Sequence, residues 1–167
     1  MTRTLILMRH AKSSWATPAL SDHDRPLNAR GHASARVMGA WLRQHGWVPD
    51  QVYSSSARRT RETFVGLGLA SDTTFTDDLY HAEPTEMLRV LSQASGNCVL
   101  MLGHNPGIAG FGEALVASPP DHPRFFDFPT CATLVAAFDI TDWRELEWGT
   151  GVSRDFVVPQ DVAPDAQ

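Results

Sequence analysis

The stretch Thr4-Leu5-Ile6-Leu7-Met8, which runs directly into Arg9 and His10, decides the predicted fold of this 167-residue chain. A short, uninterrupted apolar run is typical of a strand that is buried on both faces of a parallel sheet. A second run, Cys98-Val99-Leu100-Met101-Leu102, also leads to a histidine, His104. In open α/β sheets the functional site lies at the carboxyl ends of the strands, so we expect both histidines at that edge.

The rest of the chain alternates between helical and extended patterns. Asn28 is a predicted N-cap for a helix to about His45, and Ser54-Ser55-Ser56 is a predicted cap for a helix that reaches Phe64. Further helices are expected over residues 84–93 and 107–116, and further strands over residues 51–54, 73–80, 132–138 and 145–152. This alternation predicts an α/β fold, a three-layer α/β/α sandwich around a mainly parallel sheet.

A long polar segment, residues 11–27, follows the first strand without helical or strand periodicity. A long loop inside a small domain is usually functional, and Trp15 within it is a candidate for the entrance of a site. A second loop is expected over residues 118–129, which are rich in Pro and Asp. We expect residues 1–159 to form a single domain and residues 160–167 to form a flexible C-terminal tail.

The charged residues are acidic in balance, with 14 Lys and Arg against 19 Asp and Glu and a formal net charge of −5. We therefore expect no broad basic surface for nucleic acid or for an anionic membrane, and no apolar run is long enough to span a bilayer. Cys98 and Cys131 lie inside apolar runs, where buried thiols are expected rather than a disulfide. A cytoplasmic monomer is the default expectation.

Four side chains are expected at the carboxyl edge of the sheet: Arg9 and His10 after the first strand, Arg59 in the first turn of a helix, and His104 after the later strand. Arginine forks bind phosphate oxygens bidentately, and a neutral imidazole can attack phosphorus. A second histidine, if protonated, would stabilise charge on the phosphoryl oxygens. Each of these residues alone is more often solvated or structural, but the set indicates a pocket for a phosphoryl group.

Several short motifs of the chain together resemble those of a known family. They are Leu7-Met8-Arg9-His10-Ala11-Lys12, Asp24-Arg25-Pro26-Leu27-Asn28 with Arg30-Gly31, Ser54 to Thr63, Leu79-Tyr80-His81-Ala82, Gly103-His104-Asn105-Pro106-Gly107 and Pro129-Thr130-Cys131-Ala132. This set resembles the histidine phosphatase superfamily, and within it the small SixA-like phosphohistidine phosphatase branch. The likeness covers nearly the whole chain to Pro159, although Ala11 stands where the wider superfamily has glycine.

This resemblance implies a phosphoglycerate mutase-like fold and a phosphoenzyme mechanism in which His10 is the nucleophile. It implies that Arg9, Arg59 and His104 clamp the phosphate, and that no metal or other cofactor takes part. Arg59 is preferred over Arg58 because it precedes Thr60-Arg61-Glu62-Thr63, although the sequence leaves open which of the two arginines faces the phosphate. Ser13 and Asn105 are expected to contact the substrate beside them.

The general acid that alcohol esters need has no clear candidate in the sequence. Glu83 and Asp24 are possible proton donors, although loop carboxylates of this kind are usually solvated. A phosphorylated imidazole departs with little help because its pKa lies near neutrality, so an incomplete acid favours N-phosphate substrates. The short loops predict an open site that admits phosphohistidine on a protein, such as a histidine phosphotransfer domain or a histidine kinase.

Two other functions stay open. One is a phosphatase for a small phosphoester or phosphoramidate, with Glu83 or Asp24 as the proton donor. The other is a phosphate-binding module that recognises phosphorylated partners without turning them over.

Overall fold

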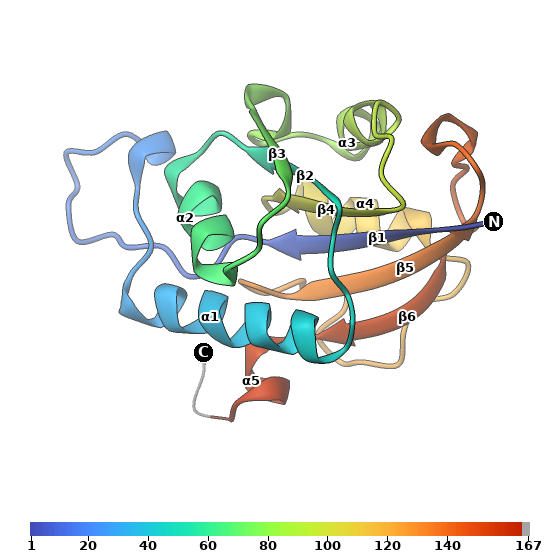
Figure 1. Ribbon diagram of the computed structural model, residues 1–167. Helices are drawn as coiled ribbons and strands as arrows, with labels where there is room; N and C mark the ends of the chain where they lie inside the picture. Colours follow the sequence, from blue (N-terminus) through green and yellow to red (C-terminus); the bar gives the residue numbers. More distant parts are fainter. Residues whose placement is uncertain (165–167) are drawn as a thin grey trace.

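The computed structural model describes residues 1–164, in which six strands form one mixed sheet (Figure 1). The strands lie in the order β3-β2-β4-β1-β5-β6, and the β1–β4, β2–β4 and β2–β3 pairs are parallel, whereas β5 is antiparallel to β1 and β6. Their bounds are β1 (Thr2–Arg9), β2 (Gln51–Ser55), β3 (Asp72–Thr76), β4 (Cys98–Gly103), β5 (Thr133–Asp139) and β6 (Val152–Val157).

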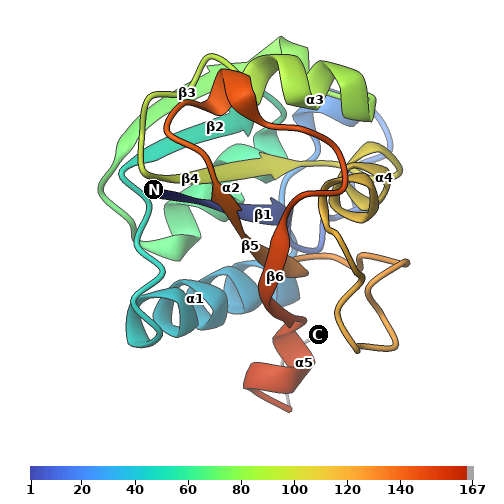
Figure 2. The same cartoon turned by 90° about the vertical axis from the view of Figure 1, so that its right-hand side faces the viewer.

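Helices cover both faces of this sheet. The α-helices are α1 (Ala29–Gln44), α2 (Arg58–Leu67), α3 (Pro84–Leu91), α4 (Gly107–Leu115) and α5 (Pro159–Val162), and short 3-10 turns lie at Asp22–Asp24, Asp77–Leu79 and Trp143–Glu145. Figure 2 shows α1 and α5 on one side of the sheet and α3 and α4 on the other. Within residues 1–164 no helix has both the length and the apolar character needed to cross a membrane.

The β1 strand shows why the predicted sandwich forms. Leu5 and Leu7 belong to the hydrophobic cluster that contains residues of α3 and α4. Ile6 and Met8 belong to a second cluster with residues of α1 and α2. Since successive strand residues point to opposite faces, an apolar residue at every position is required when both faces are covered. The predicted three-layer α/β/α architecture is confirmed.

The parallel register brings the predicted histidines to one edge. Arg9 pairs with Gly103 across β1 and β4, so His10 and His104 leave the sheet side by side. Ser54 pairs with Leu102 across β2 and β4, which places the start of α2 at the same edge.

The strand predicted over residues 145–152 is wrong. Residues 143–145 form a 3-10 turn, and Gly149 has a positive φ of 71° that turns the chain before β6 begins at Val152. Leu146 and Trp148 alternate with polar residues as in a strand, whereas β6 is an edge strand with polar Ser153-Arg154-Asp155. Periodicity therefore marked the wrong segment.

Smaller differences concern element ends. The strand predicted over residues 73–80 stops at Thr76, and α2 is capped by Ala57 rather than by a serine side chain. Within the predicted tail, residues 160–162 belong to the short helix α5. Residues 165–167 of that tail lie outside the described residues.

Candidate active site

Six of the residues expected at the site, with Trp15, line one cavity of about 260 Å³ at the carboxyl edge of the sheet. The cavity also contains side chains that sequence reasoning did not place there. Its lining residues are Arg9, His10, Lys12, Ser13, Trp15, Arg25, Arg59, His81, His104, Asn105 and Thr130.

His10 sits on the floor of this cavity, with only 6% of its surface exposed. Its Nδ1 lies 2.7 Å from the carbonyl oxygen of Ala11, which can only accept a hydrogen bond. Nδ1 therefore carries the proton and Nε2 keeps its lone pair. Burial lowers the pKa of His10 to about 3, and the nearby charges of Arg9 and Arg59 act in the same direction. A neutral imidazole with a free Nε2 is the form that can act as a nucleophile.

His104 lies beside His10, with 5.1 Å between the two ring centroids. Arg59 donates to its Nδ1 over 3.3 Å, so Nε2 donates to the Ser55 hydroxyl over 2.8 Å. Burial, followed by the neighbouring His10 and Arg59, lowers the pKa of His104 to about 2. The protonated form that the sequence suggested is thus disfavoured by the protein itself, because a guanidinium occupies the side of Nδ1.

The two expected arginines reach the cavity from different elements. Arg9, at the end of β1, donates from Nη1 to the Phe128 carbonyl over 3.3 Å, whereas its buried Nε has no hydrogen-bond partner among residues 1–164. Arg59, in the first turn of α2, is 3% exposed and lines the cavity. Arg58 is exposed and pairs with Glu62 over 3.0 Å. The structure therefore places Arg59, rather than Arg58, at the site.

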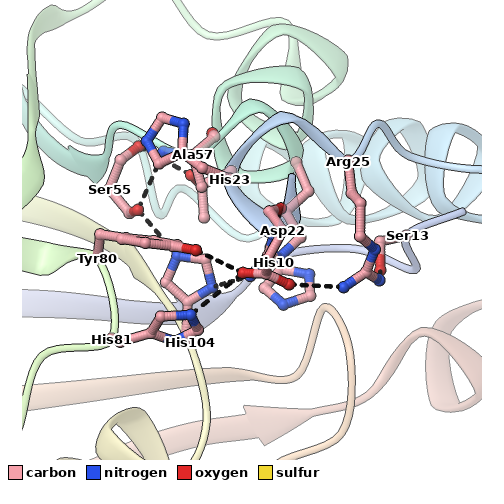
Figure 3. Close-up of polar contacts among 12 residues, drawn as sticks. His10, Ser13, Asp22, His23, Arg25, Ser55, Ala57, Tyr80, His81 and His104 are labelled. Atoms are coloured by element: carbon pink, nitrogen blue, oxygen red, sulfur yellow. Dashed lines mark hydrogen bonds and ion pairs between the residues drawn. The ribbon is translucent and has the colours of Figure 1, made fainter. Parts of the chain in front are cut away.

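Asp22 is the carboxylate that sequence reasoning missed. It accepts hydrogen bonds from Arg59 Nη2 over 3.0 Å, Arg25 Nη1 over 2.9 Å, the Tyr80 hydroxyl over 2.5 Å and His81 Nε2 over 3.2 Å. Figure 3 shows this carboxylate between Arg25 on one side and Tyr80 and His81 on the other. This loop carboxylate thus connects its own loop to α2 and to the segment that carries Tyr80 and His81.

The charge of Asp22 is fixed by these partners. Burial alone would raise its pKa, but the hydrogen bonds from Tyr80, Arg59 and Arg25 hold the pKa well below its ordinary value. Asp22 is therefore a carboxylate and not a proton donor. No local pattern in the loop sequence separates it from Asp24.

The two carboxylates proposed as donors lie elsewhere. Asp24 is exposed and accepts from the Ser21 hydroxyl over 3.1 Å. Glu83 is exposed and precedes α3 as its N-cap residue, without a capping hydrogen bond. Neither side chain lines the cavity. The structure does not bring them to this cavity.

Ser13 and Asn105 do line the cavity, but each is held by the protein. Arg25 donates a short hydrogen bond to the Ser13 hydroxyl. Asn105 donates to the carbonyl oxygens of Asp127 over 2.9 Å and Phe128 over 3.0 Å, which fixes the loop before β5. Their substrate contacts stay a prediction.

Trp15 lies at the rim and is 76% exposed. The Arg25 Cζ atom lies 3.4 Å from the centroid of its ring, so the two side chains stack. Arg25 itself is buried and is a lining residue that the sequence did not single out. The motif Asp24-Arg25-Pro26 was the sequence feature that could have identified Arg25 as a site residue.

Comparisons with known proteins identify the family that the chain resembles. Residues 5–80 match the family model of the histidine phosphatase superfamily, branch 1. A proposed phosphohistidine phosphatase SixA from Nakamurella multipartitia superposes with a TM-score of 0.83 and 30% identity, covering 95% of this chain and 97% of that one. A second proposed SixA, from Agrobacterium tumefaciens, gives a TM-score of 0.76 and 28% identity over 94% and 98% of the two chains.

The same likeness extends to sequence relatives. A Mycobacterium leprae protein of uncharacterised function is 31% identical over 163 residues, which is 92% of this chain and all of that protein. The chain belongs to the histidine phosphatase superfamily.

Proposed function

We propose that this protein is a metal-independent phosphatase that forms a phosphohistidine intermediate on His10 and acts on phosphohistidine carried by a protein. Membership of the superfamily supports a phosphatase. The observation that carries the mechanism is the tautomer of His10, because Nδ1 is bound to the Ala11 carbonyl and Nε2 is left as the attacking atom.

In the first step Nε2 of His10 attacks the phosphorus as the bond to the leaving nitrogen breaks, and the leaving imidazole keeps the electron pair. Arg9 and Arg59 bind the phosphoryl oxygens, and the unpartnered Nε of Arg9 supplies one hydrogen bond. In the second step water attacks the phosphorus, the bond to Nε2 breaks, and inorganic phosphate leaves.

The size of the site supports a protein substrate. The cavity of about 260 Å³ has room for a phosphoryl group and the side chain that carries it, so the bulk of a protein substrate must lie outside it. A histidine phosphotransfer domain or a histidine kinase could present its phosphohistidine in this way. The likeness to the two proposed SixA structures supports the same class of substrate.

Cys98 and Cys131 are both free thiols, which suits the cytoplasmic setting that we propose for the protein.

The test measures phosphate release from a phosphohistidine peptide and from p-nitrophenyl phosphate, side by side and in the presence of a chelator. We expect faster turnover of the phosphohistidine, its loss in His10→Ala, and a loss of about 10²–10³-fold in Arg59→Ala. The matched control Arg58→Ala should retain activity within about twofold, because that side chain is exposed and faces Glu62.

Other outcomes would redirect the proposal. A preference for the ester would favour the small phosphoester or phosphoramidate phosphatase. Binding of phosphate without turnover of either compound would favour the binding module.

A further inference from the structure

The site as described lacks a proton donor for an oxygen leaving group. His10 attacks from the buried floor, so an in-line displacement sends the leaving group towards the mouth of the cavity. An alkoxide is a poor leaving group unless it is protonated as the bond breaks. The donor must therefore be a titratable side chain near the mouth.

Three carboxyl groups and a phenol are excluded as the proton donor. Asp24 and Glu83 do not line the cavity. Asp22 is held as a carboxylate by its hydrogen bonds, as described above. The Tyr80 hydroxyl donates a hydrogen bond to Asp22, and burial together with that carboxylate raises the pKa of Tyr80 above its ordinary value.

His81 has the position and the chemistry that a proton donor needs. It lines the cavity, its side chain is half exposed, and its ring centroid lies 5.3 Å from that of His104. Its Nε2 lies 3.2 Å from an oxygen of Asp22 (Figure 3). Because that carboxylate can only accept, Nε2 keeps its proton and donates a hydrogen bond to it. Nδ1 is then the atom that exchanges a proton. An imidazole is the side-chain type that takes up and releases protons near neutral pH.

The backbone holds His81 in an unusual conformation. Its φ is 53°, in the left-handed region that is unfavourable for a non-glycine residue. The next residue, Ala82, packs so closely on α4 that its carbonyl oxygen would lie 1.9 Å from a Cβ atom at Gly107. A strained residue that is fixed by its surroundings and aimed at a cavity is typical of a functional position.

We propose that His81 is the proton donor for oxygen leaving groups and that Asp22 is its positioning residue. This inference rests on the proposed attack by His10 and adds a second substrate class, phosphate monoesters of aliphatic alcohols. As the P–O bond breaks, its electron pair stays on the leaving oxygen, which takes the Nδ1 proton of the His81 imidazolium. When water then attacks the phosphorylated His10, Nδ1 takes a proton from that water, which restores the donor.

The experiment compares kcat/KM for substrates whose leaving groups differ in basicity: O-phosphoserine, phenyl phosphate and p-nitrophenyl phosphate. We expect His81→Gln to lose about 10²–10⁴-fold on O-phosphoserine. The loss should be less than about threefold on p-nitrophenyl phosphate and on a phosphohistidine peptide, because those leaving groups depart without a proton donor. The control His32→Gln changes an exposed histidine on α1 and should leave all values unchanged.

A double-mutant cycle tests the role of Asp22. In an Asp22→Asn background, His81→Gln should cost little more on O-phosphoserine, since the donor is already misplaced. Additive losses in this cycle would overturn the positioning role.

Two results would overturn the assignment of His81 as the proton donor. One is an equal loss on every substrate in His81→Gln, which indicates a purely structural role. The other is a wild-type protein that turns over phosphohistidine but no alkyl phosphate, which leaves the proposed function standing. If the wild type turns over none of these compounds, the proposed function itself fails.

Discussion

At the scale of single residues, the hydrogen bonds of the cavity fix which atoms of His10 and His104 carry protons. His10 and His104 are buried beside Arg9 and Arg59, and both imidazoles are neutral because their pKa values are lowered to about 3 and about 2. A bound phosphate dianion would raise both pKa values by Coulombic attraction. The neutral state is therefore a property of the protein before it meets its substrate.

This burial predicts how stability depends on pH. In the unfolded chain a histidine binds a proton below about pH 6.5, whereas folded His10 does so only below about pH 3. Between these values the unfolded state binds more protons, so stability falls as the pH falls. Each such histidine contributes a slope of about 1.4 kcal/mol per pH unit. Denaturant unfolding of His10→Asn between pH 6 and pH 4 should show a slope that is smaller by this amount. An unchanged slope would contradict the neutral His10.

At the scale of elements, the sequence predicted those strands whose position depends on a local hydrophobic pattern. The apolar runs that became β1 and β4 were recognisable because both of their faces are buried, and Arg9, His10 and His104 follow from them. The edge strand β6 was missed because its polar residues lack that pattern. Asp22 and His81 could not be placed, since their meeting depends on how two loops pack in space.

A close approach between elements gives a second prediction. A Cβ atom at Gly31, near the start of α1, would lie 2.1 Å from the carbonyl oxygen of Lys12, just after β1. Gly31→Ala must push the helix away from the strand end that carries His10, and we expect it to lower the unfolding free energy by about 1–3 kcal/mol and to reduce kcat/KM.

The matched control is Gly112→Ala within α4, where the nearest atom would lie at an ordinary 3.4 Å. There the better helix propensity of alanine should leave stability unchanged or raise it by up to about 1 kcal/mol. Equal effects of the two substitutions in denaturant unfolding would show that the close approach has no consequence.

At the scale of the whole molecule, an acidic chain carries a local site for an anion. The net charge is −5, yet three arginines converge at one edge of the sheet. Inorganic phosphate should therefore stabilise the fold without a metal, by about 2.7 kcal/mol at one hundred times its dissociation constant. Thermal unfolding with phosphate and a chelator checks this. The rise in unfolding temperature should vanish in Arg9→Ala, and its persistence there would place the anion elsewhere. The same rise with chloride at equal ionic strength would show that the effect is not specific to phosphate.

The carboxylate of Asp22 among the arginines also determines the charge of the anion that the site can balance. Of the four cations that line the cavity, Lys12 is exposed, whereas Arg9, Arg25 and Arg59 are buried or half-buried. These three guanidinium groups, with ionised Asp22 and the neutral His10 and His104, leave two uncompensated positive charges in the buried part of the site. A phosphate monoester dianion balances them, whereas a carboxylate or another monoanion leaves one guanidinium uncompensated in a poorly solvated place. Without Asp22 the same walls would suit a trianion, so this single acidic residue matches the pocket to the charge of one phosphoryl group.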